Sequence, residues 1–212
     1  MTAAGEGNPT ELRGQVVLFV GEVAAVRAAL AAQVLRLGGK VAVAVPRAWQ
    51  VQGVKDELGG DGVLVGVVGA RDGEAAAGFV KGAEDALGPI TAFVFVASGA
   101  AAGPVGRDSD GALGEVLATA LLAGANVVRA LVGRLRRRKR GHVVLVGGPA
   151  AELEGANDGA AHGALRGYAA GLTAELRGSG VQVTLLDADR AEPGDAIAAR
   201  LLRCLRGAPG SA

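Results

Sequence analysis

The sequence predicts an α/β protein in which a parallel β-sheet is covered by helices on both faces. Short runs such as Gln15–Val20 (QVVLFV) and Ile90–Ala97 (ITAFVFVA) are apolar at nearly every position, which is the pattern of strands buried on both faces. Segments with apolar residues at helical spacing separate these runs. Strict alternation of strand and helix is typical of a parallel sheet.

The first strand is followed by a helix whose apolar residues recur every three or four positions, namely Val23, Val26, Leu30, Val34 and Leu37. Gly38-Gly39 ends this helix. The later predicted elements, in chain order, are strand Val41–Val45, helix Val51–Leu58, strand Val63–Val68, helix Glu74–Leu87, strand Ile90–Ala97, a long helix from Ala112 to about Arg134, strand His142–Val146, a long helix rich in small residues, strand Val181–Leu186 and helix Asp195–Leu205.

Right-handed crossovers between these strands give a doubly wound, Rossmann-like sheet with about six strands in the order 3-2-1-4-5-6. No second domain, linker or repeat is visible. We therefore expect a flexible leader over residues 1–13, a single domain over 14–206 and a short tail over 207–212.

Composition excludes several classes of function. The 22 basic and 21 acidic residues nearly cancel, so no global charge favours nucleic acid or a membrane surface. One cysteine cannot form an internal disulfide, and two histidines with one cysteine give no metal-binding cluster at zinc spacing. The first residues lack the apolar core of a signal peptide. These observations predict a soluble cytoplasmic protein.

The stretch Gly141–Gly178 combines a strand, a Gly-Gly-Pro turn and a small-residue helix, and the strand VQVTLL follows it. This layout resembles the fifth strand, fifth helix and sixth strand of the short-chain dehydrogenase/reductase family, and the resemblance extends over residues 12–206. It implies four catalytic positions: a serine after the strand, the Tyr-x-x-x-Lys pair on the helix, and an asparagine in the preceding helix. They fall on Gly148, Asp158, His162 and Leu121 respectively.

None of these four residues carries the group that the resemblance requires. The family uses the tyrosine as general acid/base, the lysine to lower its pKa, and the serine to orient a carbonyl. The only tyrosine, Tyr168, has Leu172 four residues later, so no shifted motif replaces the pair. The sequence therefore favours a non-catalytic protein. As an alternative, Asp158 and His162 share a helix face and form a replacement dyad; otherwise Asp158 caps the helix and His162 is a polar residue of its first turn.

The family's cofactor turn, Thr-Gly-x-x-x-Gly-Ile-Gly, aligns with residues 20–27, where only Gly21 matches. Ala25 and Arg27 stand where glycines let backbone amides approach a pyrophosphate, and Glu22 adds a negative charge. Arg47, after the second strand, and Gly99, after the fourth, are the other remnants. We expect no cofactor, with weak binding of NADP or NAD as the alternative.

Two further segments bear on function. After VTLLDADRAEP the resemblance implies a substrate-covering loop and a seventh strand, and we expect both to be missing, because the sequence passes almost directly to DAIAARLLRCLRG. The basic run Arg134–Arg140 is interpreted as a solvated helix terminus, with an anion or partner contact as the alternative.

The fourth and fifth helices keep broad apolar or smooth surfaces. The residues expected at a subunit interface are Leu117, Leu122, Ala125, Gly163, Gly167, Ala170 and Ala174; an alanine-rich helix facing solvent is the competing interpretation. The leading hypothesis is an inactive structural or regulatory subunit that pairs through these helices with a catalytically intact paralogue. This arrangement is similar to heteromeric reductases and hydroxyacyl-CoA dehydrogenases. The alternatives are a divergent NAD(P)-dependent oxidoreductase using Asp158 and His162, and a homo-oligomeric ligand sensor.

Overall fold

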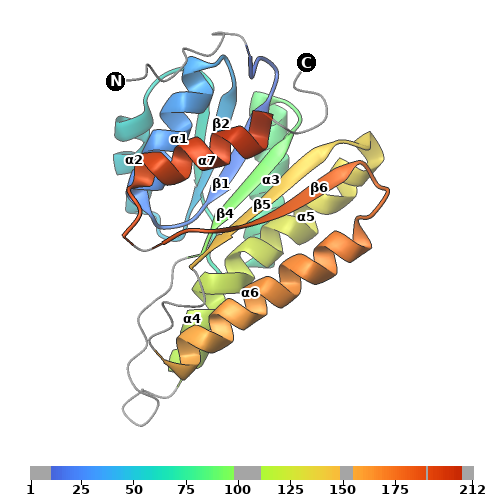
Figure 1. Ribbon diagram of the computed structural model, residues 1–212. Helices are drawn as coiled ribbons and strands as arrows, with labels where there is room; N and C mark the ends of the chain where they lie inside the picture. Colours follow the sequence, from blue (N-terminus) through green and yellow to red (C-terminus); the bar gives the residue numbers. More distant parts are fainter. Residues whose placement is uncertain (1–10, 98–110, 149–154, 190, 207–212) are drawn as a thin grey trace, which may run out of the picture.

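The computed structural model describes residues 11–97, 111–148, 155–189 and 191–206. Its centre is a six-stranded sheet in the order β3-β2-β1-β4-β5-β6, in which every neighbouring pair is parallel (Figure 1). The strands are β1 (Val16–Val20), β2 (Lys40–Val45), β3 (Val63–Val67), β4 (Ala92–Val96), β5 (Gly141–Gly147) and β6 (Val181–Asp187). The predicted sheet and strand order are confirmed.

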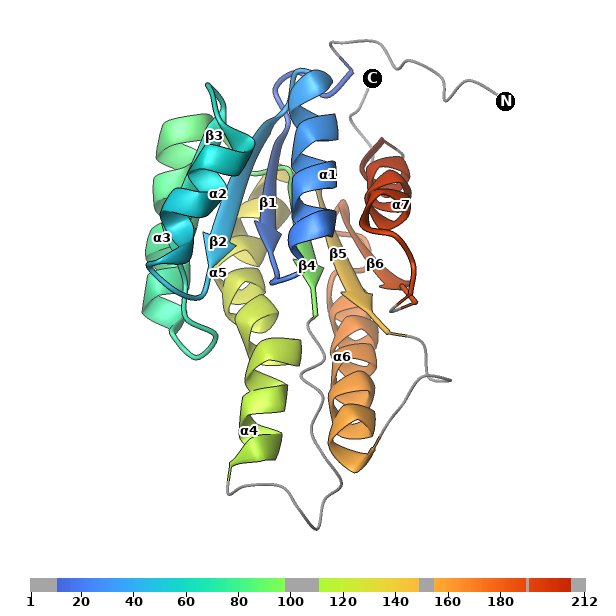
Figure 2. The ribbon, with the colours of Figure 1, turned by 90° about the vertical axis from the view of Figure 1, so that its left-hand side faces the viewer.

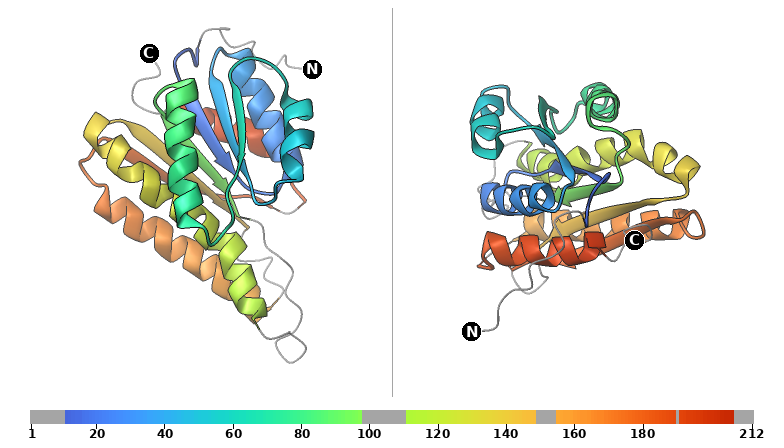
Figure 3. Two further views of the ribbon diagram at one scale, coloured as in Figure 1. Left: turned by 180° about the vertical axis from the view of Figure 1, so that it is seen from behind. Right: turned by 90° about the horizontal axis from the view of Figure 1, so that it is seen from above.

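Helices cover both faces of the sheet. They are α1 (Ala24–Arg36), α2 (Gln50–Leu58), α3 (Gly73–Leu87), α4 (Ala112–Leu117), the π-helical turn η2 (Ala118–Leu122), α5 (Ala123–Arg138), α6 (Ala156–Glu175) and α7 (Gly194–Arg206). In Figure 1, α1, α2 and α7 lie in front of the sheet, and the view from behind shows α3, α5 and α6 on the other face (Figure 3).

The continuous apolar runs of the strands follow from this double cover. Every residue of β1 and β4 is buried. Val17 and Phe19 belong to the core beneath α1 and α7, whereas Leu18 belongs to the core beneath α3, α5 and α6. Because successive side chains point to opposite faces, a strand with helices on both sides needs apolar residues at every position.

The helix predicted from Ala112 to about Arg134 continues to Arg138 and contains the π-turn η2. Lys139 ends it in a left-handed conformation, with φ 51°. The residues from Ala112 to Arg138 are long and apolar enough to span a bilayer, with mean hydropathy 1.8 and 39% of the most apolar window buried. Gly124 lies directly on Phe95, where an added Cβ would come within 2.6 Å of the ring. The side of this segment that carries Gly124 therefore packs against the sheet.

The folded domain begins earlier than the predicted boundary at residue 14. Leu12 is fully buried, and its N–H donates to the Leu37 carbonyl at 2.9 Å. Glu11 pairs with Arg206 at 2.9 Å, which ties the start of the domain to the end of α7. Glu11 and Leu12, which the sequence places in the leader, therefore contact the folded domain.

Two arginines of the basic run have a structural partner rather than solvent alone. Arg134 pairs with Glu84 of α3 at 2.7 Å, and Arg138 contacts the same carboxylate and donates to the Ile90 carbonyl at 2.9 Å. Burial raises the pKa of Glu84, but hydrogen bonds from Arg138, the Ile90 N–H and Arg134, together with the charge of Arg138, outweigh it, and the net pKa lies below the usual value. Arg134 is half-buried and Arg138 is exposed, so this terminus faces solvent, and the two residues also hold α5 against α3.

Candidate functional site

Three of the positions implied for catalysis lie just after β5 and in the first turns of α6, two elements that pack together. An added Cβ on Gly147 would lie 2.8 Å from Cδ2 of Leu165, so the end of β5 packs directly against α6. Gly148 follows at once and is exposed. Asp158 lies in the first turn of α6, and His162 lies one turn further on. The strand end and the helix therefore lie in the order that the resemblance implies.

Asp158 does not cap α6. The helix begins at Ala156, and its N-cap is Gly155, which has no side chain to cap it. Asp158 is half-buried in the first turn, where a carboxylate interacts favourably with the positive end of the helix. The expected cap was displaced because the helix starts two residues before the aspartate. At α3, by contrast, an aspartate is the N-cap: Asp72 Oδ1 accepts a hydrogen bond from the Ala75 N–H at 2.8 Å.

His162 has a partner that the sequence analysis missed. Arg166 Nε–H donates to His162 Nε2 at 2.8 Å, and Arg166 Nη2 pairs with Asp187 at the end of β6 at 2.5 Å. This donor direction requires the Nε2 lone pair, so in this arrangement Nε2 accepts a hydrogen bond from the arginine and its lone pair is occupied within the protein. The spacing of four residues between His162 and Arg166 was the available signal; the pairing with Asp187 had none.

The other two positions, Gly148 and Leu121, carry no polar side chain. Around Gly148, no atom lies within 4 Å of the place that a Cβ would take, so there is room for a serine but no hydroxyl. Leu121 lies in η2 and packs against the core beneath α3, α5 and α6. A π-turn often marks a functional position in a helix, yet here the side chain at that position is a hydrocarbon in the core.

Gly21 remains at the first strand-to-helix turn for a packing reason. Its φ of 152° is unfavourable for residues with a side chain, and an added Cβ would lie 2.7 Å from the carbonyl oxygen of Val96. The turn after β1 therefore passes directly over the end of β4. Close packing of two strands accounts for this glycine without a bound phosphate.

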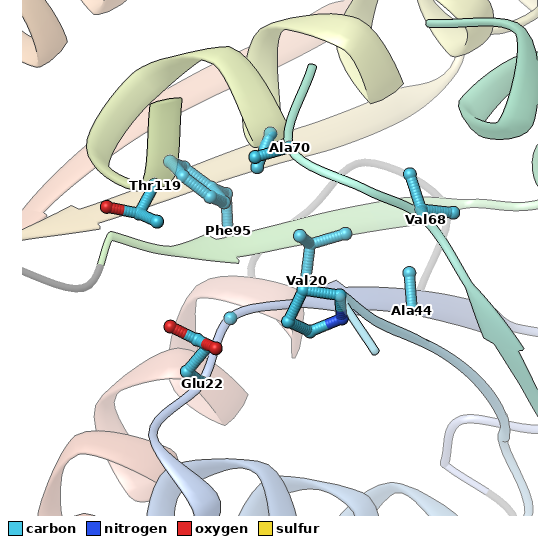
Figure 4. Close-up of a pocket in the computed structure, with 10 residues that line it drawn as sticks. Val20, Glu22, Ala44, Val68, Ala70, Phe95 and Thr119 are labelled. Atoms are coloured by element: carbon cyan, nitrogen blue, oxygen red, sulfur yellow. The ribbon is translucent and has the colours of Figure 1, made fainter. Parts of the chain in front are cut away.

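A crevice opens at the carboxyl ends of β1 to β4. Its volume is about 30 Å³, which is enough to hold ordered water. In Figure 4 the Glu22 carboxylate and the Thr119 hydroxyl lie toward one end, and Ala44 and Val68 toward the other. Its lining residues are Val20, Gly21, Glu22, Ala44, Pro46, Val68, Ala70, Phe95, Thr119 and Ala123. Glu22 is its charged residue, and the rest of the wall is almost entirely apolar.

The residues at the start of α1 do not fit a dinucleotide. Arg27 Nη2 pairs with Glu57 of α2 at 2.8 Å, and the Arg27 side chain is only 11% exposed, so the charge is directed away from a ligand. Gly194 of α7 packs tightly against Ala25, where an added Cβ would lie 2.6 Å from Cβ of Ala25. Together with the Glu22 carboxylate, these contacts oppose a pyrophosphate at this turn.

Neither of the other cofactor remnants changes this result. Arg47 is exposed, and its backbone N–H donates to Gln50 Oε1 at 3.0 Å in the turn before α2. Gly99 lies outside the described residues. In the part of the chain that the structure describes, no three histidine, cysteine, aspartate or glutamate side chains gather as metal ligands.

The surface expected at a subunit interface divides into two parts. The four α6 positions, Gly163, Gly167, Ala170 and Ala174, are exposed. Leu122 is 39% exposed, and Ala125 is half-buried. Leu117 instead packs partly within the chain, against a small cluster of α4, η2 and α6 residues. Figure 2 shows that α4 and the beginning of α6 extend beyond the ends of the strands, where the sheet does not cover them.

Comparisons with known proteins agree with this description. The sequence model of the short chain dehydrogenase family matches residues 15–188. Serine dehydrogenase from Escherichia coli is 22% identical, with a TM-score of 0.78 over 92% of both chains. A metagenomic short-chain oxidoreductase in complex with NADP is 24% identical, with a TM-score of 0.78 over 93% of both chains.

A putative short-chain dehydrogenase from Novosphingobium aromaticivorans is 21% identical, with a TM-score of 0.80 over 93% of this chain and 79% of that one. Comparison with curated protein sequences gives no significant match. The structural similarities establish the fold, and the match of the family model over most of the chain establishes the family. This chain belongs to the short-chain dehydrogenase family.

Proposed function

We propose that this chain is a catalytically inactive member of the family that acts as a structural or regulatory subunit for a catalytically intact paralogue, of reductase or hydroxyacyl-CoA dehydrogenase type. The observation that carries the proposal is the engagement of His162 by Arg166, which Asp187 holds in turn. At the position that the resemblance gives to a catalytic lysine, the chain has an imidazole whose Nε2 already accepts an internal hydrogen bond.

The chemistry supports this interpretation. Proton transfer to a carbonyl needs a positioned acid and a group that orients the substrate. Gly148 offers no hydroxyl, Leu121 offers no amide, and Asp158 is shorter than a tyrosine and lacks its phenol. Because the turn after β1 also does not fit a pyrophosphate, both halves of the expected active site are changed in the same protein. The fold is kept while its site is lost, and function must lie elsewhere on the molecule.

The exposed helix surface supports a role in assembly. Leu113 and Leu122 are 43% and 39% exposed, on the segment of α4 and η2 that extends past the sheet. On α6, exposed glycine and alanine residues leave a smooth surface that lets another helix approach closely. Burial of such leucines against a partner is favourable. A paralogue with the same fold presents equivalent helices, so we propose a soluble, cytoplasmic complex formed through α4, η2, α5 and α6.

Size-exclusion chromatography with light scattering, on this chain mixed with an intact short-chain dehydrogenase paralogue from the same source, tests the proposal. We expect one complex containing both chains. Ala170→Arg places a charge on the smooth face of α6 and should abolish the mixed complex. Ala77→Arg changes an equally exposed helical alanine on α3 and should leave it intact. Separate elution of the wild-type chains would contradict the proposal.

A further inference from the structure

The outer edge of β6 presents unpaired backbone groups. β6 is the last strand of the sheet, and within the described ranges only β5 pairs with it. Ala188 donates its N–H to the Gly147 carbonyl at 2.8 Å. This bond shows which residues of β6 direct their backbone groups toward β5. Because successive residues of a strand direct their backbone groups to opposite sides, Gln182, Thr184 and Leu186 face β5. The odd-numbered residues from 181 to 187 therefore face outward.

Both ends of this outward row are closed within the chain. The Val181 N–H donates to Ser179 Oγ at 3.2 Å, and Arg200 Nη2 donates to the Asp187 carbonyl at 2.7 Å. These two bonds confirm that odd-numbered residues face outward. Val183 and Leu185, between the closed ends, direct both N–H and C=O groups outward, and none of these has a partner among the residues described. An open edge of this kind is a template for another strand.

We propose that a second copy of this chain pairs with β6 in antiparallel orientation, about a two-fold axis at Thr184, so that the sheet continues through both chains. In this register, Val183 lies opposite Leu185 of the second copy, and the reverse pair forms by symmetry. Each open N–H then meets an open C=O. This is strand addition at a sheet edge, in which main-chain hydrogen bonds supply the affinity.

The closed ends select this register over its neighbours. An axis at Val183 would place Leu185 opposite Val181, whose N–H is already used by Ser179. An axis at Leu185 would place Val183 opposite Asp187, whose carbonyl is already used by Arg200. An axis midway between two residues would place an even-numbered residue opposite an odd-numbered one. Backbone groups that face β5 would then lie opposite groups that face outward. Only the axis at Thr184 pairs the two open residues with each other.

Side chains agree with the same register. Val183 and Leu185 both pack at the margin of the core beneath α6, so the two chains would form apolar cross-strand pairs on that face. On the opposite face, Gln182 would lie opposite Leu186, and Thr184 opposite its own copy. No two like charges meet. The sequence VQVTLL also contains no proline or lysine of the kind that protects exposed strand edges.

An engineered disulfide tests the register. In a non-hydrogen-bonded antiparallel pair, opposite Cα atoms lie about 4.5 Å apart, which is within the range for a disulfide. In a Cys204→Ala background, Thr184→Cys should give a covalent dimer under mild oxidation on a non-reducing gel. In the Gln182→Cys variant the cysteine faces Leu186 of the second copy instead, so no covalent dimer should form. Absence of a dimer from the first variant, or equal dimer from both, would overturn the proposal.

A proline substitution tests the hydrogen bonds and separates this contact from the one proposed with a paralogue. Leu185→Pro removes one outward N–H, at a position where an edge strand tolerates proline. The wild-type chain alone should show the mass of two chains in light scattering, and this variant the mass of one. Ala170→Arg should leave that homodimer intact. Leu185→Pro should still bind the paralogue through the α4–α6 face. A monomeric wild type overturns the β6 contact, whereas loss of the mixed complex alone overturns only the proposed function.

Discussion

Arg166 and His162 lie one turn apart on α6, and the arginine Nε–H donates to the histidine Nε2 at 2.8 Å. The same guanidinium reaches Asp187 at the end of β6. A helix that resembles a catalytic helix is thereby tied to the neighbouring strand through its own polar side chains. Proton transfer at this site would first have to break that arrangement, which is the structural reason to look for function on the surface of the helices.

Replacing Arg166 should separate the role of this contact in structure from a role in catalysis. Arg166→Met leaves His162 Nε2 without its donor, so the imidazole nitrogen chemical shifts should change in NMR spectra. Both partners of the Arg166–Asp187 pair are substantially exposed, so the free energy of unfolding should fall by less than about 1 kcal/mol. Unchanged nitrogen shifts would contradict the hydrogen bond. The matched control is Arg177→Met, an exposed arginine beyond the end of α6.

Two glycines at the carboxyl ends of the strands should differ in how strongly their substitution lowers the free energy of unfolding. Gly21→Ala must place a Cβ against the Val96 carbonyl at a φ of 152°, so we expect a loss of about 2–4 kcal/mol from strain and overpacking. Gly148→Ser has open space and should change stability by less than about 0.5 kcal/mol. Chemical denaturation of both variants measures the difference. Equal stability of the two would show that the turn after β1 is not tightly packed.

The two arginines that pair with Glu84 should make the free energy of unfolding depend on pH. Because the folded-state pKa of Glu84 lies below its usual value of 4.5, its contribution is complete above that pH and is lost as pH falls through the lower, folded-state pKa. Glu84→Gln should therefore cost about 1–2 kcal/mol near pH 7 and progressively less in acid. Denaturation across pH checks this. Asp85→Asn, in an exposed pair with Lys81, should have little effect at any pH.

His142 should make a second pH-dependent contribution to the free energy of unfolding. It is 3% exposed, its Nε2 lies 2.8 Å from Thr184 Oγ1, and no group takes a hydrogen bond from Nδ1 in good geometry. Burial lowers its pKa below 6.5, and the Cys204 backbone carbonyl opposes this only partly. The unfolded chain therefore binds the proton more readily, so stability falls as pH drops below 6.5. His142→Gln should flatten the stability profile in that range, and an unchanged slope would contradict this prediction.

Dinucleotides should not stabilise the protein. Glu22 and the internally paired Arg27 leave the start of α1 unsuited to a pyrophosphate. A ligand that binds the folded state raises its stability with the logarithm of its concentration, so millimolar NADH or NADPH should leave the thermal unfolding midpoint unchanged. A concentration-dependent rise with either compound would instead favour a divergent enzyme. An intact paralogue measured beside this chain supplies the positive control.

The sequence by itself determined the order of strands and helices and, through it, the sheet. Each of these features follows from local periodicity. Fully apolar runs predict β1 and β4, and apolar residues at helical spacing predict α1. The absence of a hydroxyl at Gly148 and of an amide at Leu121 is likewise a matter of residue identity. Exposure of Gly163 and Ala170 followed from the helical period, which sets the face they share.

The tertiary structure decided which distant residues meet. Nothing local in the chain pairs Glu84 with Arg138, Arg166 with Asp187, or Gly194 with Ala25, because these contacts exist only after the sheet has brought separate helices and strand ends together. The start of the domain at Leu12 depends in the same way on its hydrogen bond to Leu37. Long-range hydrogen bonds and close packing depend on where the elements lie in three dimensions. A pattern along the chain does not predict that placement.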